Sequence, residues 1–100
     1  MNKPETKIVK QIMVGLREKF PGAYLRKIHG NMFQHAGIPD IIGCINGFFV
    51  AFEVKTTQGH VSRIQELEGQ EISKAKGIHA VVTNLSEALE ALEGLHANKL

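Results

Sequence analysis

The dipeptide Asn46-Gly47, between two apolar runs, constrains the fold of this 100-residue chain more than any other feature. Asn-Gly in this setting is typical of a two-residue type I′ hairpin turn, because that turn needs a positive φ at both central residues. The turn fixes the antiparallel register of the flanking strands, so we expect Ile45 to face Phe48 and Cys44 to face Phe49. The pairing continues outward along the hairpin.

Three ionisable residues converge at the open end of this predicted hairpin. The register places Asp40 opposite Glu53, with Cβ atoms roughly 5 Å apart on one face. Lys55 follows Glu53 by two residues and points to the same face. One interpretation is a surface cluster in which Lys55 pairs with one acid and the other is solvated. However, two directly opposed carboxylates repel each other unless a cation lies between them.

The cation that best suits two opposed carboxylates is a hard divalent ion such as Mg²⁺ or Mn²⁺. Such an ion keeps positions open for a phosphate oxygen and a water molecule, and it can polarise a phosphodiester and lower the pKa of the attacking water. Lys55 would then orient or deprotonate that water, or offset negative charge at the phosphorus. The trio is therefore a candidate site for phosphodiester hydrolysis.

Composition supports one small domain spanning residues 1–100. Hydrophobic residues make up 43% of the chain and charged residues 22%, so a core can form. Residues 1–60 hold eight Lys/Arg against four Asp/Glu, which suits a polyanionic partner such as nucleic acid. The single cysteine, Cys44, excludes an internal disulfide and is interpreted as a core residue, and no apolar run is long enough to span a membrane. We expect a soluble, intracellular protein.

The hydrophobic periodicity predicts the element order α-β-β-β-α-β-α, an α/β fold with a central sheet between helices. Ser62 is a plausible N-cap, and Asn84 with Glu87 is a weak capping-box variant. Residues 96–100 are expected to fray. The predicted elements are a helix over 5–20, a strand over 23–29, a loop over 30–37, strands over 40–45 and 48–55, a loop over 56–60, and then a helix to 76, a strand over 79–83 and a helix over 85–95.

The spacing of these residues resembles a known family. Pro39-Asp40, a hairpin and then Glu53-Val54-Lys55 resemble the motif of the PD-(D/E)xK nuclease superfamily, and the element order is similar to its core. With Gly59, Gln65 and Gly77 added, nearly the whole chain resembles a stand-alone, virus-type VRR-NUC domain. The resemblance implies a restriction-endonuclease-like core with a central mixed sheet.

The resemblance also implies an activity. It indicates a nuclease that depends on Mg²⁺, with Mn²⁺ as a substitute, and that cuts branched DNA such as four-way (Holliday) junctions. The setting would be replication, recombination or repair of a phage or viral genome, in the cytoplasm of a bacterial host that carries the phage or prophage, or in association with the nucleoid. Two alternatives stay open within the same fold: a flap- or end-processing nuclease, and a catalytically silent nucleic-acid-binding module. A third alternative is a small interaction protein in which the acid pair is structural.

The same resemblance assigns roles to individual residues. Asp40 and Glu53 match the metal ligands, Lys55 matches the catalytic lysine, and the backbone carbonyl of Val54 is a further candidate ligand. Glu5 matches an acid on the first helix that can hold the metal directly or through water; its alternative is an acid favoured by the helix dipole. Gln65 matches a glutamine whose amide reaches the site or the nucleic-acid backbone, and its alternative is an ordinary polar residue on an exposed helix.

Four residues are candidates for contacting nucleic acid. Arg26 and Lys27 lie on the strand before the polar loop, His35 lies in that loop, and Gln58 lies in the loop after the motif. Phosphate contacts of this kind position a protein without reading sequence. For each residue the alternative is a solvated side chain. No helix-turn-helix or zinc-finger motif is present, so recognition of DNA shape is favoured over base reading.

The expected assembly is a homodimer, because a four-way junction needs two symmetric cuts and the chain has one candidate site. Two apolar helix stripes are candidate contact surfaces. The alternative is that these stripes cover the two faces of the sheet. The stripes are Ile8, Ile12 and Met13 in the first helix, and Leu85, Ala88, Leu89, Ala91, Leu92 and Leu95 in the last.

Overall fold

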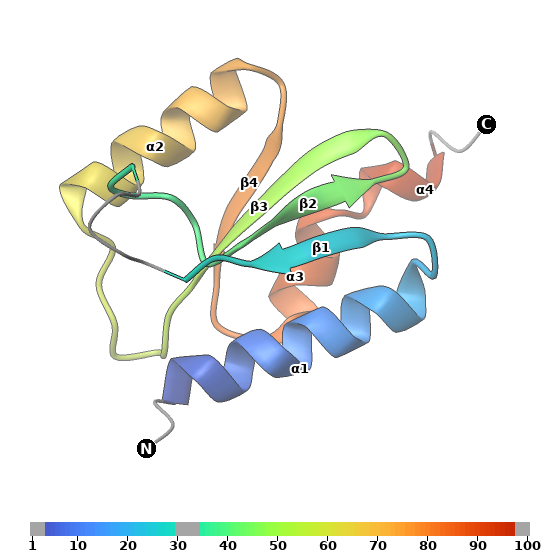
Figure 1. Cartoon of the computed structure of the whole chain (residues 1–100), viewed down its shortest axis with the longest axis horizontal. Coiled ribbons are helices and arrows are strands. Elements are labelled where there is room, and N and C mark those ends of the chain that lie inside the picture. Colours follow the sequence, from blue (N-terminus) through green and yellow to red (C-terminus); the bar gives the residue numbers. More distant parts are fainter. Residues whose placement is uncertain (1–3, 30–34, 98–100) are drawn as a thin grey trace.

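The chain folds into a four-stranded sheet with helices on both faces (Figure 1). The computed structural model describes residues 4–29 and 35–97. The predicted element order is confirmed, with one short helix added at the end. The elements are α1 (Pro4–Lys19), β1 (Tyr24–Lys27), β2 (Ile41–Ile45), β3 (Phe48–Val54), α2 (Arg63–Lys74), β4 (Ile78–Val82), α3 (Leu85–Ala91) and α4 (Gly94–Ala97).

The β2–β3 hairpin has the turn and the register that the sequence predicts. Asn46 has φ 52° and Gly47 has φ 87°, the positive values that a type I′ turn requires. Ile45 pairs with Phe48 and Cys44 with Phe49, and the ladder continues to Ile41 opposite Phe52. The next rung outward therefore brings Asp40 level with Glu53.

The sheet has the strand order β1-β2-β3-β4. β1 and β2 are antiparallel, as are β2 and β3, whereas β3 and β4 are parallel. A parallel pair needs a crossover connection, which α2 supplies over one face of the sheet (Figure 1). The carboxyl ends of β3 and β4 consequently lie side by side.

The helices α1 and α3 cover the same face of the sheet and pack against each other (Figure 1). Their apolar stripes enter one core with Val50, Phe52 and Val54 of β3, and Ile12, Ala88 and Leu92 are buried within it. Gly15 allows close contact, since a Cβ there would overlap the side chain of Leu85. The prediction that these stripes form dimer surfaces is therefore wrong, and so is the alternative that they cover two different faces. Burial against a single face of the sheet explains why both helix stripes are apolar.

The opposite face is covered only in part. α2 packs against β4, and Gly69 leaves the room that the imidazole of His79 occupies. Burial there lowers the pKa of His79. Near the hairpin turn the side chains of this face remain open on β1, β2 and β3: Tyr24 is 56% exposed and Phe49 45%, and Cys44, which lies between them, is also exposed. Cys44, expected in the core, is thus a surface residue.

Two helix ends differ from the sequence-based prediction. α2 ends at Lys74, and the left-handed position after it is Lys76, with φ 74°, while Gly77 donates its N–H to Ile72 O at 2.9 Å. The last predicted helix is divided, because α3 ends at Ala91 and α4 begins at Gly94. Residues 96 and 97, expected to fray, close α4, and residues 98–100 lie outside the described part.

The predicted loop over 30–37 is described only from His35 onward; residues 30–34 lie outside the described part. Within the residues that the structure does describe, no helix combines the length and the apolar character that crossing a membrane requires.

Candidate active site

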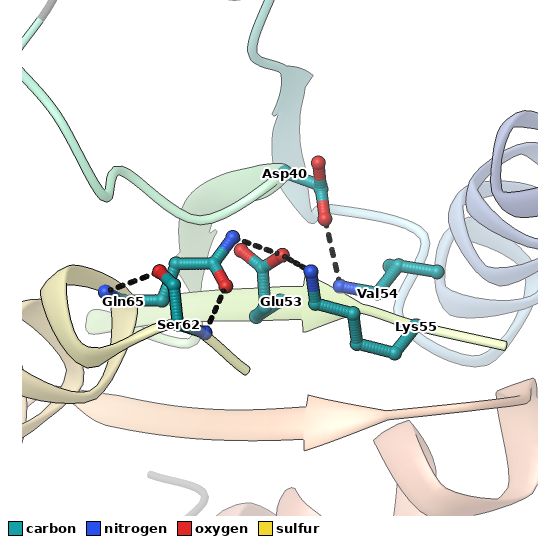
Figure 2. Close-up of polar contacts among 6 residues, drawn as sticks. All are labelled: Asp40, Glu53, Val54, Lys55, Ser62 and Gln65. Atoms are coloured by element: carbon teal, nitrogen blue, oxygen red, sulfur yellow. Dashed lines mark hydrogen bonds and ion pairs between the residues drawn. The ribbon is translucent and has the colours of Figure 1, made fainter. Parts of the chain in front are cut away.

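The candidate active site lies where β3 ends and the segment before β2 approaches it. Asp40 directly precedes β2, and its Oδ2 accepts a hydrogen bond from the backbone N–H of Val54 at 2.8 Å (Figure 2). Pro39, beside it, is fully buried. On the other side, Asp40 O accepts from the N–H of Ile28 at 2.8 Å. These contacts hold the Asp40 carboxylate next to Glu53, as the hairpin register predicts.

Glu53 is the centre of the site. Only 3% of this residue is exposed, and its carboxylate is contacted from two sides (Figure 2). Gln65 Nε2 donates to Glu53 Oε2 at 2.8 Å, and Lys55 Nζ lies 3.4 Å from the same oxygen. The Lys55 side chain is 17% exposed, so its ammonium group lies at the boundary between the buried carboxylate and solvent.

The environment of Glu53 disfavours its charged form. Burial first, and then the charge of the nearby Asp40 carboxylate and hydrogen bonding to it, raise the pKa of Glu53 from 4.5 to about 7. The Lys55 ammonium group opposes this shift and lowers the pKa. One lysine therefore does not compensate two adjacent carboxylates, and the site has a deficit of positive charge.

Gln65 reaches the site from the first turn of α2. Its N–H donates to Ser62 Oγ at 3.2 Å, and its side-chain Oε1 accepts from the N–H of Ser62 at 2.9 Å, which completes a capping box. The sequence predicted the Ser62 cap and the approach of Gln65 separately but missed the link between them. The spacing Ser-x-x-Gln over residues 62–65 is the signal that indicates it.

The donor set fits a hard divalent cation that keeps several water ligands. Such an ion is commonly bound through one or two carboxylates, and the site offers those of Asp40 and Glu53. Within a strand, the N–H and C=O of one residue point to the same edge, so the Val54 carbonyl faces the side on which its N–H meets Asp40. In the described part of the chain, no three His, Cys, Asp or Glu side chains form a metal-binding group. Glu5, half-buried in the first turn of α1, is thus not joined to the two acids in such a group.

The residues predicted to contact nucleic acid occupy different surfaces. Side chains alternate along β1, so Arg26 shares the face of Glu53 whereas Lys27, opposite Ile41, points to the helix-covered face. The Arg26 guanidinium lies 4.2 Å from the centre of the Tyr24 ring. His35 Nε2 lies 3.0 Å from Glu68 Oε1, which ties the loop to α2. Gln58 is exposed in the loop after β3.

These features define a restriction-endonuclease-like fold with its acidic cluster at the end of the central hairpin. A solved VRR_NUC domain has the same fold: the TM-score is 0.69 at 21% sequence identity, over 92% of this chain and 97% of that one. No family model matches the sequence, and neither does any curated protein. The fold implied by the sequence resemblance is thereby confirmed.

Proposed function

We propose that this protein is a metal-dependent nuclease that hydrolyses phosphodiester bonds of DNA. One observation carries the proposal: Asp40, Glu53 and Lys55 converge at the end of β3, within the fold of a VRR_NUC domain. A site for a divalent cation needs negative charge that its own side chains leave uncompensated before the ion binds. The two carboxylates, with one lysine beside them, provide that charge. The side chains present also supply one cation, Lys55, at the solvent boundary.

The residues of the site have separable tasks. Asp40, Glu53 and the Val54 carbonyl would hold Mg²⁺ or Mn²⁺, which when bound polarises the phosphodiester and lowers the pKa of a water molecule. The Val54 N–H occupies Asp40 Oδ2, so Oδ1 is the oxygen of Asp40 left for the cation. Lys55 then donates to the attacking water or to a phosphate oxygen, and it stabilises the charge that develops at phosphorus.

We propose branched DNA, such as a four-way junction, as the substrate, in a role in replication, recombination or repair. The open part of the sheet face supports this, because Arg26 lies on the face of Glu53 and provides positive charge without a base-reading element. Contacts that track shape and backbone suit a branched duplex better than a defined sequence.

The direct test is a gel assay with end-labelled four-way junctions, flaps and linear duplexes of one sequence. Each is incubated with Mg²⁺, Mn²⁺, Ca²⁺ or excess chelator. We expect cleavage of branched substrates with Mg²⁺ or Mn²⁺, binding with little cleavage in Ca²⁺, and none in chelator. Undiminished cleavage in chelator would contradict the mechanism. Binding without cleavage in every metal would instead favour a silent binding module, and cleavage confined to flaps or ends would identify a processing nuclease.

We also propose that the active form is a homodimer. Each chain supplies one site, whereas symmetric cleavage of a junction needs two related by a twofold axis. The helix stripes are buried in the core, so the candidate contact surface is the open row of Tyr24, Cys44 and Phe49, which pair directly across three strands. An exposed apolar row of this kind is typical of a surface that is covered in an assembly.

A further inference from the structure

The side chain of Gln65 belongs to two structures at once, the cap of α2 and the candidate active site (Figure 2). Its Oε1 accepts from the N–H of Ser62 at 2.9 Å, and its Nε2 donates to Glu53 Oε2 at 2.8 Å. Ser62 Oγ in turn accepts from the backbone N–H of Gln65 at 3.2 Å. These bonds connect an exposed serine outside the site to the buried carboxylate at its centre.

The two bonds of the amide allow one orientation only. A primary amide accepts hydrogen bonds through its oxygen and donates them through its nitrogen. The Ser62 N–H must face the oxygen, and the Glu53 carboxylate must face the nitrogen. A flipped amide would place donor against donor at Ser62 and acceptor against acceptor at Glu53. The cap therefore determines which end of Gln65 the active site meets.

The residue type at position 65 shows which of the two interactions, the helix cap or the contact with Glu53, requires glutamine. Either Glu or Gln completes a capping box, so the cap alone does not require glutamine. A glutamate here would direct another carboxylate at Glu53 Oε2, in place of the donor that Gln65 Nε2 supplies at 2.8 Å. Glutamine satisfies the cap and supplies a donor to the carboxylate. The candidate site thus requires an amide at position 65, and the capping box fixes the orientation of that amide.

We propose that Ser62 is a positioning residue of the active site: through the capping box it holds the Gln65 amide with Nε2 presented to Glu53. The effect on cleavage rests on the proposed nuclease function, whereas the effect on the Gln65 amide does not. Ser62 touches neither of the two acids. Its hydroxyl accepts the backbone N–H of Gln65 and so fixes the turn in which the backbone N–H of residue 62 faces Gln65 Oε1. Groups behind a metal ligand commonly fix the position of that ligand in a similar way.

The test compares four variants with two measurements, ¹⁵N relaxation of the Gln65 side-chain amide in metal-free protein and the cleavage rate of a branched DNA. Ser62→Ala keeps the backbone N–H that binds Gln65 Oε1 but removes the hydroxyl that fixes this turn. We therefore expect a more mobile Gln65 amide and cleavage slowed roughly 10-fold, the size of effect that outer positions at metal sites show. Ser62→Thr keeps the hydroxyl and should restore both. Gln65→Glu keeps the cap and the melting temperature, but cleavage should fall at least as far as in Ser62→Ala.

The fourth variant is a matched control on another helix. Asn84 caps α3 by accepting the N–H of Glu87 at 2.9 Å, and α3 packs on the opposite face of the sheet. Asn84→Ala should lower the melting temperature about as much as Ser62→Ala without slowing cleavage. The proposal is wrong if Ser62→Ala leaves the Gln65 amide as ordered as in the wild type, or if Asn84→Ala slows cleavage equally. A wild type that cuts nothing would refute the nuclease function, and the relaxation data would still decide the role of Ser62.

Discussion

At the scale of single residues, the burial of Glu53 dominates the chemistry. It is the only charged residue that is buried within the described part of the chain, and its partners are Asp40, Lys55 and Gln65. Replacing Asp40 with Asn or Glu53 with Gln keeps the shape of the side chain but removes a ligand charge. We expect cleavage to fall by at least ~100-fold, since loss of a direct ligand exceeds the effect of an outer residue. DNA binding, measured by gel shift in Ca²⁺, should persist or tighten, because less negative charge faces phosphate.

The shifted pKa of Glu53 predicts how stability depends on pH. The folded protein releases this proton near pH 7 and the unfolded chain near pH 4.5, so the folded state binds more protons between these values. The free energy of unfolding should therefore fall as pH rises from 4.5 to 7, by at most about 3 kcal/mol, and level off above. Urea denaturation at pH 5 and pH 8 measures this difference.

Two controls isolate the contribution of Glu53 to that difference. Glu53→Gln, which cannot ionise, should flatten the dependence in this window. At pH 8, Mg²⁺ at 100 times its dissociation constant should add about 2.7 kcal/mol to the wild type, because the ion binds only the folded state. Burial also lowers the pKa of His79, which acts in the opposite direction, so the two proteins are compared with each other. An identical pH dependence in the wild type and in Glu53→Gln would show that the Glu53 carboxyl is not protonated in the fold as we describe.

Lys55 is the cation that opposes this shift. Lys55→Ala removes the ammonium group 3.4 Å from Glu53 Oε2, so the pKa of Glu53 should rise further and the water or phosphate loses its donor. We expect cleavage near pH 7 to fall ~100-fold or more, the range of effect for a positioned acid–base group. The melting temperature should change little, because Lys55 points away from the core. Lys10→Ala, an exposed lysine on α1, should leave cleavage unchanged; unfolding of Lys55→Ala would assign Lys55 a structural role instead.

At the scale of elements, the site depends on how closely β1 approaches β2. A Cβ on Gly43 would overlap the backbone carbonyl oxygen of Tyr24 and lie 2.9 Å from a methyl group of Leu25. Backbone cannot move aside as a side-chain tip can, so Gly43→Ala should destabilise the fold by about 2 kcal/mol or more. Gly22→Ala is the matched control, since a Cβ there meets nothing within 4 Å. The urea midpoints of the two variants measure this difference in stability. Equal midpoints would refute the close approach of β1 to β2.

The sequence predicted the elements whose determinants are local. Asn46-Gly47 sets the hairpin register, and that register places Asp40 beside Glu53 without any tertiary information. Ser62 marks the start of α2 through its own hydrogen bonds. By contrast, no local signal indicates that α1 and α3 share one face of the sheet, or that Cys44 is exposed. These depend on which helix covers which strand, a property of the assembled fold.

The candidate site was also predicted in part, again where the position of a residue is determined locally. Asp40, Glu53 and Lys55 follow from turn type and strand alternation. The position of Gln65 depends on where α2 docks, which the spacing of residues does not encode. Arg26 and Lys27 were grouped by sequence proximity, but alternation along β1 separates them onto opposite faces. Side chains alternate between the two faces along a strand. Applying this alternation to β1, as to the hairpin, would have placed Arg26 and Lys27 on opposite faces.

At the scale of the whole molecule, the helices are distributed unequally over the sheet. α1 and α3 bury one face, whereas α2 covers only the β4 side of the other (Figure 1). The acids of the candidate active site and the open row of Tyr24, Cys44 and Phe49 therefore share a face, at opposite ends of the hairpin. A surface that carries both a reaction site and uncovered apolar side chains can pair with a second copy while the sites stay open to DNA.

A homodimer formed through this row predicts a specific response to charge. Light scattering at micromolar concentration should report about twice 11.0 kDa for the wild type. Phe49→Lys places an ammonium group in the contact and should give a monomer, because an unpaired charge is costly to bury. Val14→Lys is the matched control: Val14 is 49% exposed against 45% for Phe49, but it lies on α1, over the other face. The dimer should survive Val14→Lys.

The Phe49→Lys monomer should nick single arms of a four-way junction and lose paired cleavage. A monomeric wild type that still cuts both strands in concert would contradict the assembly.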